Sequence, residues 1–122
     1  MVYQSKRALV CDEEAWWRDL IHKLLTARGM EVNLLDQLDQ GLTEAGKGGY
    51  DIILMSDLVL DSPALESRLQ DLLGSESNPQ VVLVSATPDW QKARESFLLG
   101  VADHITKSVK DDEILSELAR HL

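Results

Sequence analysis

The stretch Ala8-Leu-Val-Cys-Asp-Glu-Glu14 decides the fold of this chain. A short apolar run ends abruptly in acidic residues, and a helical pattern with a single buried stripe follows it. The stripe consists of Trp17, Leu20, Ile21, Leu24 and Leu25. Gly29 comes after this stripe as a stop signal. We therefore expect a buried strand followed directly by a helix that packs on it.

The same unit of strand and helix recurs along the chain. Further strands are expected at residues 32–35, 52–55, 81–84 and 104–106, and further helices near residues 38–45, 64–73, 89–99 and 111–122. Alternating short apolar strands and helices predict an α/β fold, with a parallel sheet covered by helices on both faces. Ligands of such folds bind beyond the carboxyl ends of the strands. The length of 122 residues fits one domain over residues 1–122.

Composition narrows the class of partner. The chain has 12 basic and 21 acidic residues and a formal net charge of −9, which opposes attraction to nucleic acid phosphates, so no direct nucleic acid partner is expected. The single cysteine, Cys11, lies within an apolar strand and is interpreted as a buried core thiol. No apolar run has the length of a membrane span, so a cytoplasmic location without membrane attachment is expected.

Polar residues stand at the expected strand ends, where function should lie. Carboxylates brought together in a crevice of low dielectric repel one another, and a bound hard cation such as Mg²⁺ relieves that repulsion. A hydroxyl and an ammonium on the opposite side could hold phosphoryl oxygens. The residues that fit these parts are Asp12, Glu13, Glu14, Asp57, Ser85 and Lys107.

At these residues the sequence resembles the response-regulator receiver domains of two-component signalling. The resemblance rests on the segments Val10-Cys-Asp-Glu-Glu14, Val84-Ser-Ala86 and Gly100-Val-Ala-Asp-His-Ile-Thr-Lys107, in that order. It implies a single (βα)5 flavodoxin-like, doubly wound domain with strand order 2-1-3-4-5. It also implies a signalling role instead of an enzymatic one, in which a histidine kinase donates a phosphoryl group to an aspartate of a Mg²⁺-binding pocket and the receiver at most catalyses its own phosphorylation and dephosphorylation.

The resemblance assigns roles to individual residues. Asp57 would be the phosphoacceptor and a metal ligand, and Lys107 and Ser85 would grip the phosphoryl oxygens. Switching would involve Ser85 and His104. The remaining metal ligands would be Asp12, Glu13 and the Val59 backbone carbonyl.

The resemblance also implies partners. Upstream would stand a histidine kinase or a phosphotransfer protein. Downstream, an output domain or protein would bind through the fourth helix, the fifth strand and the fifth helix of a monomer or weak dimer.

The acceptor position itself has two alternatives. Counting without gaps from Tyr50 places Ser56 at the acceptor position, whereas the residues that follow favour Asp57. Since neighbouring residues of a strand face opposite sides, only one of the two can point into the acidic pocket. If that residue is Ser56, the domain is a pseudo-receiver that binds proteins without phosphotransfer. Glu13, where an aspartate is usual, also favours this alternative.

Two further interpretations belong to this stage. Glu14 alone suits a helix N-terminus, where carboxylates cap free amides. A flavodoxin-like cofactor binder is a distant alternative, because the chain lacks a loop rich in glycine and hydroxyl groups after the first strand.

Overall fold

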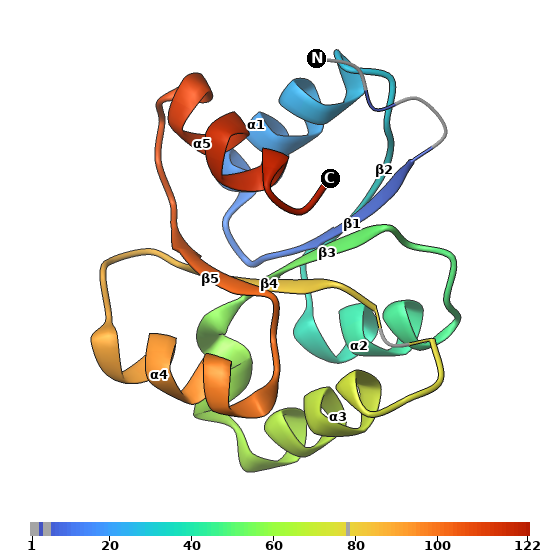
Figure 1. Ribbon diagram of the computed structural model, residues 1–122, viewed down its shortest axis with the longest axis vertical. Coiled ribbons are helices and arrows are strands. Elements are labelled where there is room, and N and C mark those ends of the chain that lie inside the picture. The colour runs from blue at the N-terminus through green and yellow to red at the C-terminus, as the bar shows by residue number, and fades with distance from the viewer. Residues whose placement is uncertain (1–2, 4–5, 78) are drawn as a thin grey trace.

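The computed structural model describes residue 3, residues 6–77 and residues 79–122. Over this part of the chain, strands and helices alternate as the sequence predicts (Figure 1). The strands are β1 (Arg7–Cys11), β2 (Glu31–Leu35), β3 (Ile52–Ser56), β4 (Val81–Ser85) and β5 (Asp103–Thr106). The α-helices are α1 (Ala15–Thr26), α2 (Leu38–Gly46), α3 (Pro63–Leu73), α4 (Trp90–Leu99) and α5 (Asp111–Ala119).

The strands form one parallel sheet in the order β2-β1-β3-β4-β5. Helices α1 and α5 cover one face of this sheet, and α2, α3 and α4 cover the other (Figure 1). This arrangement confirms the predicted doubly wound fold and its strand order. None of the helices in the described ranges is long and apolar enough to cross a membrane.

Alternation along the strands divides the core in two. In β3, Ile52 and Leu54 pack with α1 and α5, whereas Ile53 and Met55 pack beneath α2 and α3. Every residue of β3 is buried, and complete burial of an aliphatic side chain stabilises the fold by about 1.5–3 kcal/mol. The same alternation gives Ser56 the parity of Leu54, and it turns the next side chain to the opposite side of the sheet.

Helix ends follow local rules that the sequence carries. Helix α4 begins after Asp89, whose carboxylate accepts a hydrogen bond from the Lys92 amide. It ends at Gly100, which has a φ of 97° in the left-handed region that glycine adopts without steric cost. These two signals fix the length of α4, which covers the strand ends described below.

Two segments differ from the expectation. A short 3₁₀ helix, η1 (Asp57–Asp61), directly follows β3, and the Ser56 hydroxyl accepts a hydrogen bond from the Leu58 amide at its start. The last helix was expected to reach residue 122, but α5 ends at Ala119. The apolar pattern continues to the end because Leu122 still packs against the core, although it lies outside the helix.

Candidate functional site at the strand ends

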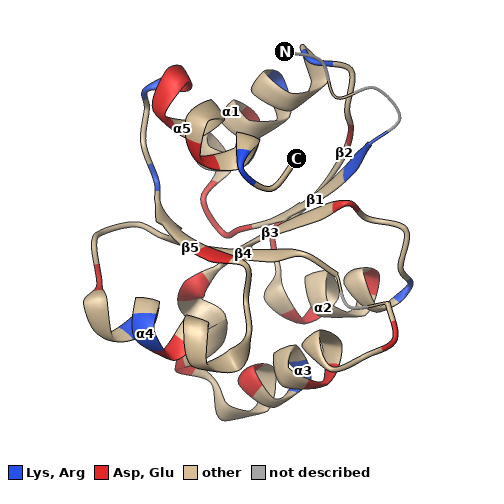
Figure 2. Cartoon of the chain, viewed as in Figure 1, with Lys and Arg blue, Asp and Glu red and all other residues tan. Residues whose placement is uncertain are grey.

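Four charged residues gather beyond the ends of β1 and β5, and we call them the Lys107 cluster: Asp12, Glu13, Glu14 and Lys107. The Lys107 ammonium donates to Oδ1 of Asp12 and to Oε1 of Glu14, each at 2.8 Å, and lies 3.9 Å from Glu13. The side chains of Lys107 and Asp12 are almost completely buried. Figure 2 marks the acidic residues of this cluster between β1 and α1.

Backbone contacts place this cluster. The Asp12 amide donates to the Leu35 carbonyl of β2, and the Lys107 amide donates to the Ser85 carbonyl of β4. The Arg18 guanidinium of α1 donates to the Asp12 carbonyl at 2.7 Å. Asp12 and Lys107 are therefore held together by the sheet and by α1, although 95 positions separate them in the sequence.

Burial and pairing shift the charges of this cluster. Burial raises the pKa of Asp12 above its ordinary value, and the hydrogen bond from Lys107 only partly offsets that rise. Burial by itself lowers the pKa of Lys107, but hydrogen bonds to Asp12 and Glu14 raise it overall. The hydrogen bond from Lys107 lowers the pKa of Glu14. The site thus stabilises an ammonium between two carboxylates.

A second group lies beneath α4, and we call it the Asp57 cluster: Asp57, Asp61, Lys92 and His104. Oδ2 of Asp57 lies 3.1 Å from Nε2 of His104, and Oδ1 lies 3.8 Å from Nζ of Lys92. Lys92 also pairs with Asp61 at 3.0 Å. The side chains of Asp57 and His104 are almost completely buried. Asp57 is therefore engaged from β5 and α4.

The two clusters do not share the Asp57 carboxylate. Among the residues that the structure describes, no ion pair within 4.0 Å joins Asp57 to Lys107. Parity explains the separation, because Asp57 follows the last residue of β3 and faces α4. The structure thus brings Asp12, Glu13 and Lys107 together as expected, and it places Asp57 with His104 instead.

The hydroxyl groups of the expected site make local contacts. Ser85 donates to the Thr87 carbonyl, and Ser56 accepts the amide of Leu58. Val59 lies buried within η1. In this arrangement neither hydroxyl bonds to Lys107, so their expected roles in phosphoryl binding stay predictions.

Two participants were missed by sequence reasoning. Glu14 occupies the N-cap position of α1, but its carboxylate makes no cap hydrogen bond and instead binds Lys107 and the Trp16 indole. The interpretation of Glu14 as a helix cap is therefore wrong. Lys92 lies in the middle of an amphipathic pattern, and nothing in that pattern signals its contact with Asp57.

The residues of the Lys107 cluster fit a hard cation. Oxygen atoms of Asp12, Glu13 and Glu14 all lie within 4.8 Å of one another, which suits a shared ion. Oδ2 of Asp12 is buried and has no hydrogen-bond partner, whereas buried carboxylate oxygens are normally paired. These carboxylates would hold Mg²⁺, which would neutralise negative charge at the strand ends.

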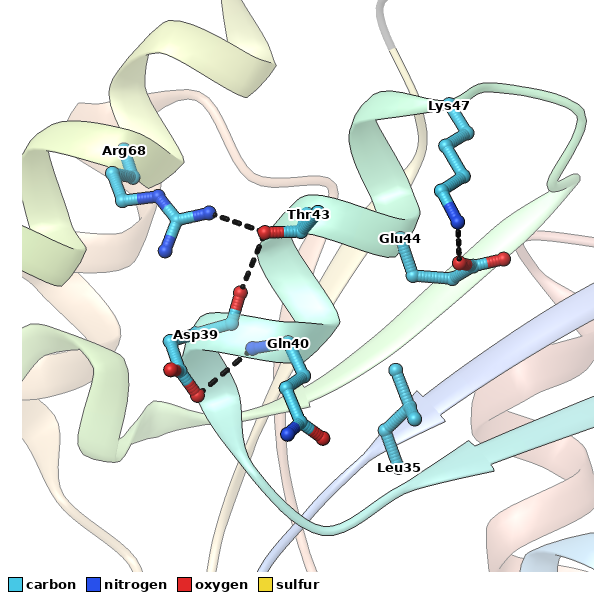
Figure 3. A pocket seen from close by; sticks show the side chains of 7 residues that line it. All are labelled: Leu35, Asp39, Gln40, Thr43, Glu44, Lys47 and Arg68. Atoms are coloured by element: carbon cyan, nitrogen blue, oxygen red, sulfur yellow. Dashed lines mark hydrogen bonds and ion pairs between the residues drawn. The ribbon is translucent and has the colours of Figure 1, made fainter.

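A separate surface pocket lies between α2 and α3 (Figure 3). Its charged groups satisfy one another or nearby hydroxyls: Lys47 pairs with Glu44, and Arg68 donates to Thr43. Because no buried polar atom points into it, the strand ends remain the candidate site.

Comparison with known proteins agrees with this geometry. A family model described as the response regulator receiver domain matches residues 8–119. This chain belongs to the response regulator receiver family. Receiver domains are signalling modules of two-component systems, and typical enzymes are not found among them.

Curated relatives of this receiver are regulators. It is 28% identical over 112 residues to the transcriptional regulatory protein DltR of Streptococcus agalactiae, and the match covers 92% of this chain and 50% of DltR. The chain therefore spans about half the length of that relative. It is 27% identical over 117 residues to the chemotaxis protein CheY of Treponema pallidum, covering 93% of this chain and 80% of CheY.

Solved structures share the fold. The response regulator TrrA of Thermotoga maritima, solved in complex with Mg²⁺ and BeF, superposes with a TM-score of 0.76 at 20% identity and covers 96% of this chain and 99% of TrrA.

Proposed function

We propose that this receiver is a protein-binding signalling module that works without phosphoryl transfer to Asp57. One observation carries the proposal: the Asp57 carboxylate lies 3.1 Å from His104 on the α4 side of the sheet and makes no ion pair with Lys107. In-line transfer to a carboxylate needs the acceptor, a cation and an ammonium to converge on one phosphoryl group. The separation of the two clusters removes that convergence.

Ser56 supports the same proposal. It has the strand parity of Leu54 and ends β3 on the side of α1 and α5. The residue in this position is a serine, and its hydroxyl accepts the Leu58 amide. A serine lacks the charge that binds a divalent cation strongly, so the step expected of a receiver aspartate has no carboxylate there.

Phosphoryl transfer from a histidine kinase to Asp57 is the second candidate. The cation fit of Asp12 and Glu13 favours it, as does the similarity to TrrA, which was solved with Mg²⁺ and BeF. In that function Ser85 and Lys107 hold the phosphoryl oxygens, and the Val59 carbonyl and Asp57 complete the metal site. It requires the Asp57 side chain to leave His104 and turn toward Lys107.

The partner of this module is a protein under either candidate. Large apolar side chains are exposed on α4, with Trp90 at 89%, Leu98 at 77% and Phe97 at 58% exposure. Exposed apolar groups that gather on one helix suit a protein interface. They support output through α4, β5 and α5, with a histidine kinase or phosphotransfer protein upstream, for one receiver domain over residues 1–122.

Mass spectrometry distinguishes the two candidates. The protein is incubated with Mg²⁺ and acetyl phosphate beside Asp57→Asn, Ser56→Ala and, as a matched control, Asp61→Asn. We expect no phosphate-sized mass increase in the unmodified protein, because no acceptor carboxylate faces Lys107. A mass increase that is present in Asp61→Asn and absent only in Asp57→Asn would overturn the proposal and establish the second candidate.

Ser56→Asp gives the experiment a positive arm. It places a carboxylate at the parity that faces Asp12 and Lys107, so we expect this variant to gain the mass increase that the unmodified protein lacks. A gain in Ser56→Asp alone identifies the missing carboxylate as the reason for the loss of phosphotransfer.

A further inference from the structure

We propose that Asp12, Glu13 and Glu14 bind a divalent cation by themselves, with Glu14 as a ligand and Asp57 outside the site. The inference deepens the proposed function, and it rests on that function in excluding Asp57. The segment that joins β1 to α1 thus becomes a self-contained cation site, whose state the Trp16 side chain reports.

The free oxygen atoms carry the first step. Lys107 occupies one oxygen of Asp12 and one oxygen of Glu14, each at 2.8 Å. Oδ2 of Asp12 remains without a partner, although Asp12 is only 1% exposed. A buried carboxylate oxygen that lacks a donor costs free energy unless a cation or a proton approaches it. Glu13 and Glu14 stand within 4.8 Å to share such a cation.

Charge counts in the same direction. Three carboxylates and one ammonium leave the Lys107 cluster with a net charge of −2 when all are ionised, because −3 and +1 sum to −2. A divalent cation would neutralise that remainder, whereas a monovalent cation would not. Lys107 therefore reduces the charge of the cluster without replacing the cation.

Exposure of the two glutamates suits a hydrated ion. The Glu13 and Glu14 side chains are 42% and 36% exposed, so both can adjust toward the ion while water keeps access to it. Mg²⁺ retains several water ligands and takes few carboxylates. The chemistry of the site points to Mg²⁺ or a similar hard cation.

Trp16 links this site to a signal that can be measured. Its indole Nε1 donates to Oε2 of Glu14 at 2.8 Å, and its ring lies edge-on to Trp17 with the centroids 5.8 Å apart. A cation on Glu14 would withdraw charge from the oxygen that accepts the indole proton. The environment of Trp16 must then change when the ion binds.

Calorimetric titration of the whole chain with Mg²⁺ tests the ligands. We expect one site whose affinity is unchanged within about twofold in Asp57→Asn and falls about tenfold or more in Glu14→Gln, since even groups behind a metal ligand are worth about 10–100-fold. Asp19→Asn, an exposed change on the same helix, is the matched control and should bind as the unmodified protein does. Absence of heat in the unmodified protein, or equal losses in Asp57→Asn and Glu14→Gln, would overturn the inference.

Fluorescence gives an independent readout. In a Trp90→Phe background, which removes the exposed indole of α4, Mg²⁺ should change the tryptophan emission, and further replacement by Trp16→Phe should abolish most of that change while calorimetry still detects the ion. Circular dichroism monitors folding, and Glu14→Asp, which keeps the carboxylate, should retain more affinity than Glu14→Gln. An emission change that survives Trp16→Phe would contradict the reporter role of Trp16.

The cation test fails separately from the proposed function. Phosphorylation of Asp57 would reject the proposed function, but the titration would still show whether Asp57 is a ligand. Conversely, absence of phosphorylation together with loss of Mg²⁺ binding in Asp57→Asn would reject only this inference.

Discussion

The Lys107 cluster and the Asp57 cluster lie at the same edge of the sheet, yet they face opposite sides of it. In the first, an ammonium lies between the carboxylates of Asp12 and Glu14 on the side of α1 and α5. In the second, a carboxylate lies between His104 and Lys92 on the side of α4. The difference shows that one residue of register decides which carboxylates share a cation.

Buried pairing makes Lys107 the most sensitive point of the comparison. Lys107→Met removes the buried ammonium that two carboxylates share, and uncompensated buried charges are strongly destabilising. We expect the free energy of unfolding to fall by about 3–5 kcal/mol, measured by urea denaturation. Lys110→Met is the control, because Lys110 is exposed and its pair with Glu113 at 3.5 Å contributes about 0–1 kcal/mol. Similar losses in both variants would mean that the buried cluster has no special weight.

The Asp57 cluster should be less sensitive, because it holds its carboxylate with two cationic side chains. His104→Phe removes one partner of Asp57 and leaves Lys92 at 3.8 Å. We expect a loss of about 1–3 kcal/mol in the free energy of unfolding, from a buried carboxylate that has lost a hydrogen bond. His22→Phe, on the exposed face of α1, should stay within about 0.5 kcal/mol. If the clusters are separate, Mg²⁺ affinity is the same in His104→Phe as in the unmodified protein, whereas an altered affinity would couple them.

The smallest expected effect concerns acid. The hydrogen bond from Lys107 lowers the pKa of Glu14 in the folded state, so Glu14 contributes stability that is present above its unfolded pKa and is lost as the pH falls through the folded pKa. The stability advantage of the unmodified protein over Glu14→Gln should therefore shrink as the pH falls from about 6 to about 3. Urea denaturation at a series of pH values measures this advantage. Glu113→Gln is the control, and a constant advantage of the unmodified protein over Glu14→Gln at all pH values would show that Glu14 is not paired with Lys107 in solution.

The sequence alone determined the architecture of this protein. Five apolar runs with helical patterns between them predict the doubly wound fold, because burial of both faces of a parallel sheet demands this pattern. It also indicated that Asp12 and Lys107 would meet, because both directly follow buried strands and the carboxyl ends of parallel strands share one edge.

The tertiary structure alone decided which side chains meet within that edge. Sequence reasoning left Ser56 and Asp57 as alternatives, because both stand at the end of one strand and only packing fixes which face each takes. It could not show that Lys92 approaches Asp57 or that Glu14 binds Lys107, because these contacts depend on how α4 and α1 dock on the sheet. Contacts between segments distant in sequence depend on the packed geometry of the whole domain, which local patterns do not encode.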